Sequence, residues 1–287
     1  SDLEYKTPSI LSPIFVSLEV IVECIMPLFI MRFIEEISNG KDSNSLPMEI
    51  ILYYGGILVG MALLSLTFGM LSGRFAARAS AGFAKNLRKD MYYAIQDYSF
   101  SNIDKFSTSS LVTRLTTDVT NVQMAYMMII RVAIRCPLML AFSLAMAFTV
   151  NVTISWVFVA LIPILAGVLT AVILKCFPIF ERVFKKYDNM NRSIREDIKG
   201  IRVVKSFVRE DFEKQKFEKT SADVAKDFTL GERLMAINTP VMQFWIWFSF
   251  LMIFLLAALL TVGGKPVGEG DLTVLIMYAS QILSSIM

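Results

Sequence analysis

Residues 47–98 read PMEIILYYGGILVGMALLSLTFGMLSGRFAARASAGFAKNLRKDMYYAIQDY, and this stretch decides the architecture of the chain. It is apolar from Pro47 to about Leu71, then becomes charged, and it keeps a helical pattern with no second proline. One helix of this length rises about 78 Å at ~1.5 Å per residue, whereas the hydrocarbon core of a bilayer is about 30 Å thick. We therefore predict a membrane-spanning helix that projects far into water on one side.

The composition supports a membrane protein. Of the 287 residues, 55% are hydrophobic and only 18% are charged, which is too apolar for an ordinary soluble domain and indicates an α-helical membrane protein. The absence of histidine excludes histidine metal sites and His-based nucleophilic catalysis from this sequence. The three isolated cysteines, Cys24, Cys136 and Cys176, lie in or beside apolar runs. We expect them to be small buried residues and predict neither a disulfide framework nor a metal site.

The fold class that we predict is an all-α membrane protein with six transmembrane helices. The expected helices lie at about 10–37, 47–98, 109–150, 154–208, 222–262 and 271–287, the sixth being incomplete. The third and fourth are separated only by the turn at 151–153, whereas the second, fourth and fifth are much longer than a bilayer requires. Two long helical hairpins therefore extend from one face of the membrane, with tips near 99–108 and 209–221. We see no basic segment with a cleavage site at the N-terminus, and expect no cleaved signal peptide.

The distribution of positive charge predicts the orientation. Residues 74–114 contain seven Lys and Arg and residues 175–233 contain fifteen, whereas the loops opposite contain only Lys41 and Lys265. Because cytoplasmic segments are enriched in Lys and Arg, we predict that both hairpins and the N-terminus are cytoplasmic.

Four ionisable residues at matched depths interrupt the apolar runs. Glu19 and Glu23 share one face of the first helix, and Arg131 and Arg135 share one face of the third. Measured from the external helix ends, Glu23 and Arg135 lie about 21 and 22 Å deep, and Glu19 and Arg131 also match. We predict two cross-helix pairs, Glu23–Arg135 and Glu19–Arg131. These groups either fix helix register or line a cavity that contacts a charged substrate, since intramembrane charges face a partner or a wet cavity.

Aromatic residues of the fifth helix suggest a second set of cavity residues. Phe244, Trp247 and Phe248 lie in a stretch whose aromatic side chains are spread around the helix. Aromatic and Met side chains repack readily and suit varied amphipathic ligands. Lipid-facing packing explains the same pattern equally well.

Three stretches, in this order and spacing, resemble the transmembrane domain of an ATP-binding cassette (ABC) exporter of type 1. Residues 99–123, SFSNIDKFSTSSLVTRLTTDVTNVQ, are similar to the family's tip followed by L-x-x-R-L-x-x-D. Residues 200–211, GIRVVKSFVRED, resemble its G-x-x-x-V-K-x-F-x-x-E segment, and GEGDLT (268–273) resembles the step into its last helix. The resemblance covers nearly all of residues 1–287, and the first stretch looks closest to bacterial heterodimeric multidrug members.

The resemblance implies an ATPase that this sequence does not contain. There is no G-x-x-x-x-G-K-[ST] stretch, because Gly264-Lys265 is followed by Pro266 and position 259 is Leu. ATP and Mg²⁺ would bind to a nucleotide-binding domain outside these residues. That domain is either fused downstream, which we expect from the resemblance, or a separate polypeptide. No catalytic residue and no cofactor are therefore assigned here. The full-length protein is expected to be an ATP-dependent translocase.

The resemblance also implies that each hairpin tip is a coupling helix that docks onto a nucleotide-binding domain. The residues so implied are Phe100, Ile103, Asp104 and Phe106 in the first tip and Arg209, Glu210, Asp211, Phe212 and Phe217 in the second. The alternative is that these aromatic residues only hold each hairpin together.

The function implied is one membrane-spanning half of a dimeric exporter of the plasma membrane. It would move hydrophobic or amphipathic solutes (drug-, lipid- or peptide-like) by alternating access. The expected partners are a second half, identical or paralogous, two nucleotide-binding domains, the lipid bilayer and a small-molecule substrate, with no nucleic acid. The alternatives are an ATP-gated channel on the same scaffold and a membrane anchor, for which the long hairpins would have no use.

Overall fold

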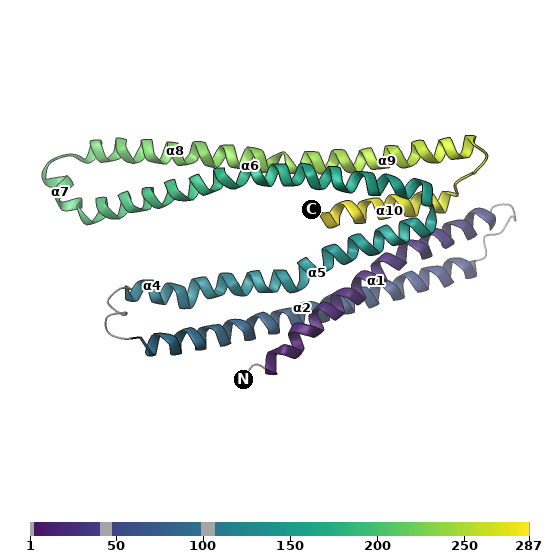
Figure 1. Ribbon diagram of the computed structural model, residues 1–287, viewed down its shortest axis with the longest axis horizontal. Helices are drawn as coiled ribbons and strands as arrows, with labels where there is room; N and C mark the ends of the chain where they lie inside the picture. The colour runs from purple at the N-terminus through teal and green to yellow at the C-terminus, as the bar shows by residue number, and fades with distance from the viewer. Residues whose placement is uncertain (1–2, 41–47, 99–106, 287) are drawn as a thin grey trace. The chain divides into compact units, whose positions relative to one another are not determined.

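The computed structural model describes residues 3–40, 48–98 and 107–286, and these form helices joined by short turns (Figure 1). The helices in chain order are α1 (Leu3–Gly40), α2 (Met48–Gln96), α4 (Thr108–Thr113), the π-helix η1 (Arg114–Asp118), α5 (Val119–Val150), α6 (Val152–Lys199), α7 (Ile201–Ser206), α8 (Glu210–Ala236), α9 (Asn238–Val262) and α10 (Glu269–Ile286). No strand occurs in these three ranges. The prediction of an all-α membrane fold is confirmed.

The number of membrane-spanning helices differs from the prediction. Within the described ranges, five helical stretches are long and apolar enough to cross a membrane: Lys6–Ser38, Met48–Gln96, Thr108–Val150, Val152–Lys199 and Glu210–Val262. The sixth expected span corresponds to α10, which is not one of the five. Its 18 residues include Glu269 and Asp271 in the first turn. These two carboxylates lower the hydropathy of a helix that is barely long enough to span the hydrocarbon core.

The second long helix lies within two residues of its predicted range, whereas two other predicted helices are interrupted. Helix α2 is continuous for 49 residues, a rise of about 74 Å. The predicted helix 154–208 is interrupted at Gly200, where the chain turns before α7 begins. The predicted helix 222–262 begins earlier, at Glu210, and is interrupted at Ile237, between α8 and α9. Pro240 explains this second break, because it has no N–H to donate to the carbonyl of Ala236 and its ring crowds that carbonyl.

Two turns show how the sequence ends its helices. Asn151 closes α5 and caps α6, since its Oδ1 accepts a hydrogen bond from the Ile154 N–H at 3.1 Å. After α9, Gly264 adopts a left-handed conformation with φ of 80°, and the Lys265 N–H donates to the Leu260 carbonyl at 2.9 Å. This is the Schellman arrangement, in which glycine avoids the steric cost of positive φ.

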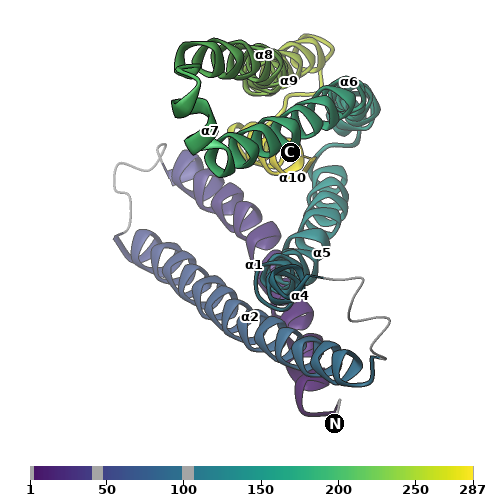
Figure 2. The same ribbon diagram turned by 90° about the vertical axis from the view of Figure 1, so that its left-hand side faces the viewer.

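The chain divides into two compact units. One contains Ser1–Phe158 with Phe250–Met287, and the other contains Val159–Ser249. In the first unit α1 crosses α2 and also packs against α5 and α10 (Figures 1 and 2). In the second unit α6 and α8 run side by side and are joined by the Lys186–Asp227 ion pair and by the edge-to-face pair Phe180–Phe228.

A proline in α1 shows why α10 packs where it does. Pro27 cannot donate to the carbonyl of Glu23, its partner one turn earlier. Gln281 of α10 supplies the missing donor, because its Nε2 lies 3.3 Å from that carbonyl oxygen. Next to it, the hydroxyl of the fully buried Tyr278 donates to the Cys24 carbonyl at 2.8 Å. Since a buried carbonyl without a donor is costly, these two bonds fix α10 against α1.

Candidate functional site

The centre of the candidate site is a cluster of three ionised side chains between α1 and α5. The Arg135 Nη1 donates to the Glu19 Oε1 at 2.6 Å, and its Nη2 donates to both carboxylate oxygens of Glu23, at 2.8 and 2.9 Å. Glu19 and Glu23 are one helical turn apart, about 6 Å along the axis. One guanidinium therefore spans both, because its donors are arranged in a rigid planar fork.

The structure forms one of the two expected pairs and replaces the other. Glu23 pairs with Arg135, whereas Glu19, which was expected to pair with Arg131, also pairs with Arg135. Arg131 takes part in no ion pair within the described ranges. Equal axial depth was thus insufficient to predict the partners, since the length and fork of Arg135 let it reach both carboxylates.

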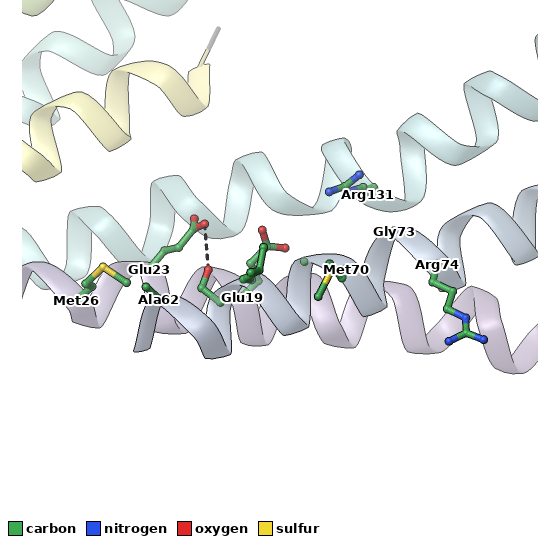
Figure 3. Close-up of a pocket in the computed structure, with 11 residues that line it drawn as sticks. Glu19, Glu23, Met26, Ala62, Met70, Gly73, Arg74 and Arg131 are labelled. Atoms are coloured by element: carbon green, nitrogen blue, oxygen red, sulfur yellow. Dashed lines mark hydrogen bonds between the residues drawn. The ribbon is translucent and has the colours of Figure 1, made fainter. Parts of the chain in front are cut away.

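Glu19, Glu23 and Arg131 border a cavity of about 770 Å³ between α1, α2 and α5 (Figure 3). Its polar lining comes from Glu19, Glu23, Ser65, Arg74 and Arg131, and its apolar lining includes Met26, Leu66 and Met70. The Ser65 hydroxyl approaches the Glu23 Oε1 at 3.5 Å, which is the dashed line in Figure 3. Figure 3 also shows Arg74 directed away from the two carboxylates. The polar groups that meet in the cavity are therefore Glu19, Glu23, Ser65 and Arg131.

Two glycines of α2 bring its backbone close to these charges. A methyl group placed on Gly69 would lie 3.1 Å from the Glu19 Oε1, and one placed on Gly73 would lie 3.7 Å from the Arg131 Nη1. Gly69 thus makes room for a carboxylate, and Gly73, one turn later, faces a guanidinium. Sequence reasoning missed both residues. The available signal was two glycines at i and i+4 in an apolar helix, a spacing that places small residues on one face.

The Glu19 carboxylate is only half satisfied. Its side chain is 9% exposed, and its Oε1 accepts from Arg135. Its Oε2 is buried and has no hydrogen-bond partner among the described residues. A buried carboxylate oxygen without a donor is costly, and so this oxygen is a natural contact for a ligand donor.

The second hairpin tip has a different structure from the one predicted. The short separate helix there is α7, Ile201–Ser206, whereas Glu210–Phe217 form the beginning of the 27-residue helix α8. The expected coupling residues Glu210, Asp211 and Phe212 thus lie in the first turn of a long helix, where the acidic side chains favourably meet the positive end of the helix dipole. Phe212 is 56% exposed, Phe217 is also exposed, and the Arg209 guanidinium lies 5.9 Å from the centre of the Phe212 ring.

Val208, between α7 and α8, adopts an uncommon backbone conformation. Its φ is 53°, the Arg209 N–H donates to the Val204 carbonyl, and the Val208 N–H donates to the Lys205 carbonyl. This is the same Schellman arrangement as at Gly264, with a β-branched residue where glycine is favoured. The side chain is 81% exposed at the tip. An exposed, strained, apolar residue has no evident stabilising role in the hairpin, and such strain is typical of functional positions.

The first hairpin tip falls outside the described residues, and with it Phe100, Ile103, Asp104 and Phe106. The chain is described again from Ser107, whose hydroxyl caps α4 by accepting from the Ser110 N–H. The stretch that resembles L-x-x-R-L-x-x-D contains the π-helix η1. Arg88 of α2 donates to the Leu115 carbonyl at 3.2 Å and to the Thr120 hydroxyl at 3.1 Å. It therefore holds the π-helix against α2.

The aromatic residues predicted to line a cavity or to face lipid do not border the cavity that contains Glu19. Phe244 and Phe248 stack with ring centres 5.9 Å apart, and Trp245 meets both rings edge-on. Phe244 and Trp247 are exposed, and neither they nor Phe248 line the cavity that contains Glu19. Cys24 and Cys176 are buried, and all three cysteines are free thiols. Among the described residues no group of three or more Cys, Asp or Glu could hold a metal ion.

The comparison with protein families gives a match over nearly the whole chain. Residues 9–287 match the family described as ABC transporter transmembrane region. The chain belongs to this family. The resemblance found in the sequence is thereby confirmed, and the described helices have the length and hydropathy that such a membrane domain requires.

The relatives are ABC transporter proteins. The chain is 30% identical over 268 residues to the uncharacterized ABC transporter ATP-binding protein YfiB of Bacillus subtilis, covering 93% of this chain and 46% of that protein. It is 26% identical over 288 residues to the putative ABC transporter ATP-binding protein MG014 of Mycoplasma genitalium, covering 91% and 46%. It is also 26% identical over 201 residues to the ATP-dependent lipid A-core flippase of Aromatoleum aromaticum, covering 70% and 33%. The chain spans less than half of the length of each of these three relatives.

Proposed function

We propose that this chain is one membrane-spanning half of an ATP-driven exporter. The observation that carries the proposal is the length of α2 and α6, which have 49 and 48 residues and extend well beyond a hydrocarbon core of about 30 Å. Rigid helices of this length transmit a displacement at the hairpin tips to the membrane segment as a rigid-body motion. Relatives named as ATP-binding proteins support an ATPase as the source of that motion.

The second hairpin tip is the proposed docking surface for that ATPase. Phe207, Val208 and Phe212 are all exposed there, beside the charged side chains of Arg209 and Glu210. An apolar centre within a polar rim is the usual composition of a protein interface. The first tip is proposed to dock in the same way. ATP and Mg²⁺ would be bound by the ATPase, because this sequence contains no phosphate-binding loop.

Hydrophobic or amphipathic solutes are the proposed substrates, and alternating access between two halves is the proposed mechanism. The cavity that contains Glu19 combines ionised groups with Met and Leu side chains, as an amphipathic solute requires. The two halves are identical or paralogous. The chain is proposed to lie in the plasma membrane with its N-terminus and both hairpins in the cytoplasm, on the basis of its Lys and Arg distribution.

The test is transport by the complete transporter, ATPase included, reconstituted in proteoliposomes. We expect ATP-dependent accumulation of an amphipathic dye, and electrical recording distinguishes a pump from a channel. Steady ATP-gated currents without uphill accumulation would favour the channel and contradict this proposal.

Coupling through the second tip is tested by Phe212→Ala. We expect this variant to hydrolyse ATP but to transport several-fold less solute per ATP, because it removes an apolar anchor from the docking surface. Phe184→Ala is the matched control, since Phe184 is also exposed, at 66% against 56% for Phe212, but lies in α6, away from the tip. Equal coupling ratios in the two variants would show that Phe212 is not part of the docking surface.

A further inference from the structure

We propose that the cavity between α1, α2 and α5 binds a zwitterionic amphiphile, with Glu19 holding its primary ammonium and Arg131 holding its phosphate or other anionic group. This inference rests on the proposed function and specifies the class of ligand. It starts from an imbalance of charge: Arg135 is shared by Glu19 and Glu23. Among the described residues, this leaves the Glu19 Oε2 without a hydrogen-bond donor and the Arg131 guanidinium without an ion pair, and both residues line the same cavity.

The negative pole is the Oε2 of Glu19. This oxygen is buried and has no hydrogen-bond partner among the described residues, although the same carboxylate pairs with Arg135 through Oε1 at 2.6 Å. A primary ammonium offers three N–H donors on a compact charge, so it can satisfy this oxygen and also reach Ser65 or Glu23, which line the same cavity. A quaternary ammonium has no N–H donor and leaves the oxygen unsatisfied.

The positive pole is the Arg131 guanidinium. It lines the cavity, is half-buried, and forms no ion pair with any described residue. Guanidinium groups bind phosphate and carboxylate through paired N–H donors. Arg74 is not the counterpart of this pole, because its side chain is directed away from the carboxylates (Figure 3).

The spacing of the two poles is set by α2. Gly69 lies against Glu19 and Gly73 lies against Arg131, and the two glycines are one turn apart, about 6 Å along the helix axis. The ammonium and phosphate of phosphoethanolamine, joined by an ethylene bridge and an ester oxygen, span a distance of the same order. Met26, Leu66 and Met70 line the rest of the cavity and can pack against an attached alkyl chain.

The proposal is tested by measuring binding to the complete transporter in nanodiscs of phosphatidylcholine, without ATP. The probe is lysophosphatidylethanolamine, which carries both poles. Lysophosphatidylglycerol lacks the ammonium, and lysophosphatidylcholine has an ammonium without N–H donors. We expect both comparison lipids to bind about ten- to hundredfold more weakly, which is the range for loss of one charge-assisted hydrogen bond. Equal affinity for all three lipids overturns the proposal.

Two substitutions assign the poles to residues. Glu19→Gln is expected to weaken binding of lysophosphatidylethanolamine about tenfold or more and to leave that of lysophosphatidylglycerol unchanged. Arg131→Gln is expected to weaken both. The matched controls are Glu36→Gln and Arg32→Gln, since both residues are exposed on α1 and neither lines the cavity. Wild-type affinity in the Glu19→Gln variant overturns the assignment.

A pair of glycine substitutions keeps the test independent of charge. Gly69→Ala retains every ionised group, but its methyl carbon would lie 3.1 Å from the Glu19 Oε1, so the carboxylate must shift by a few tenths of an ångström. Gly60→Ala is the control in the same helix, where nothing lies within 4 Å of the added methyl group. We expect only Gly69→Ala to weaken the preference for lysophosphatidylethanolamine. A preference of wild-type strength in both variants contradicts the role of Glu19.

The source of the ligand is decided by competition. Displacement of the bound lysolipid by soluble O-phosphoethanolamine indicates that free zwitterionic solutes are recognised, whereas resistance to it indicates that a membrane lipid is the ligand; both support the binding chemistry. The outcome is separable from that of the proposed function. A transporter that selects the zwitterion but does not transport refutes only the exporter, and one that transports without selecting refutes only the binding site.

Discussion

Removal of the shared guanidinium, by Arg135→Gln, should destabilise the membrane segment more than any other single charge substitution in α1 or α5. Arg135 holds Glu19 and Glu23 at 2.6 and 2.8 Å, and the substitution leaves both carboxylates without their cation. Breaking a buried ion pair by removing one partner costs about 3–5 kcal/mol. We take the lower end, about 3 kcal/mol, because 34% of the Arg135 side chain and 25% of that of Glu23 remain exposed.

The assay is the melting temperature of the complete transporter in detergent, followed by size-exclusion fluorescence. About 3 kcal/mol corresponds to a decrease of roughly 6–12 °C at about 2–4 °C per kcal/mol. The control is Arg32→Gln, an exposed arginine of α1. The combined variant Glu19→Gln, Glu23→Gln and Arg135→Gln should recover most of the loss, because it buries no unpaired charge. A melting temperature for Arg135→Gln no lower than that of the control would refute the reasoning.

The shared guanidinium also changes how a charge reversal is interpreted. For an isolated Glu23–Arg135 pair, exchanging the two charges would restore the attraction and leave a structural role intact. Here Glu23→Arg with Arg135→Glu keeps one guanidinium and two carboxylates, but the guanidinium then extends from α1, one turn from Glu19 on the same helix. The exchange therefore changes the geometry of the shared cluster as well as its charges, and the neutral combined variant separates the structural role from ligand binding more directly.

Substitutions at three further positions test the turns and the contact between α1 and α10. Val208→Gly should stabilise the hairpin tip by about 1 kcal/mol, because glycine removes the cost of positive φ. The measurement is the rate of proteolysis at the tip, which should fall; faster cleavage would show that Val208 is not strained. Gln281→Leu should cost about 1–3 kcal/mol, measured by melting, since it leaves the Glu23 carbonyl without a donor, and an unchanged melting temperature would contradict this. Asn151→Ala should lower the stability by about 1 kcal/mol through loss of the cap on α6. Asn151→Asp retains an acceptor and should lower the stability less, and equal losses of stability in the two variants would exclude capping.

Much of the fold follows from hydrophobic length, which the sequence displays directly. A continuous apolar run followed by a charged helical pattern predicted α2 and the long hairpins. The residues at which individual helices end were harder to predict from the sequence. The break at Gly200 involves a residue that many helices tolerate, and the left-handed Val208 carries no glycine or asparagine to indicate a turn. The second tip was therefore placed in the first turns of α8 instead of at α7.

The candidate site was predicted only in part, because residue spacing gives depth along a helix but not the contacts between helices. Axial depth follows from counting residues, and this placed Glu23 and Arg135 at the same level. The partner of Glu19 depends on rotation about each helix axis and on the reach of the Arg135 side chain, neither of which is encoded in spacing. Pro27 was visible in the sequence, but its consequence, a free carbonyl taken by Gln281, requires knowing that α10 lies beside α1.

The π-helix at Arg114–Asp118 has a consequence for the rotational phase of the third span. A π-helical turn contains an extra residue relative to an α-helical one, and one residue corresponds to about 100° of rotation at 3.6 residues per turn. Everything from Val119 to Val150 is thus turned relative to α4 by that single inserted residue. Deleting one residue within η1 would change the rotation of α5 relative to α4 by about 100° without altering any residue of the ion cluster. The rotation of the first hairpin relative to the membrane segment of α5 is therefore set at η1, which Arg88 holds against α2.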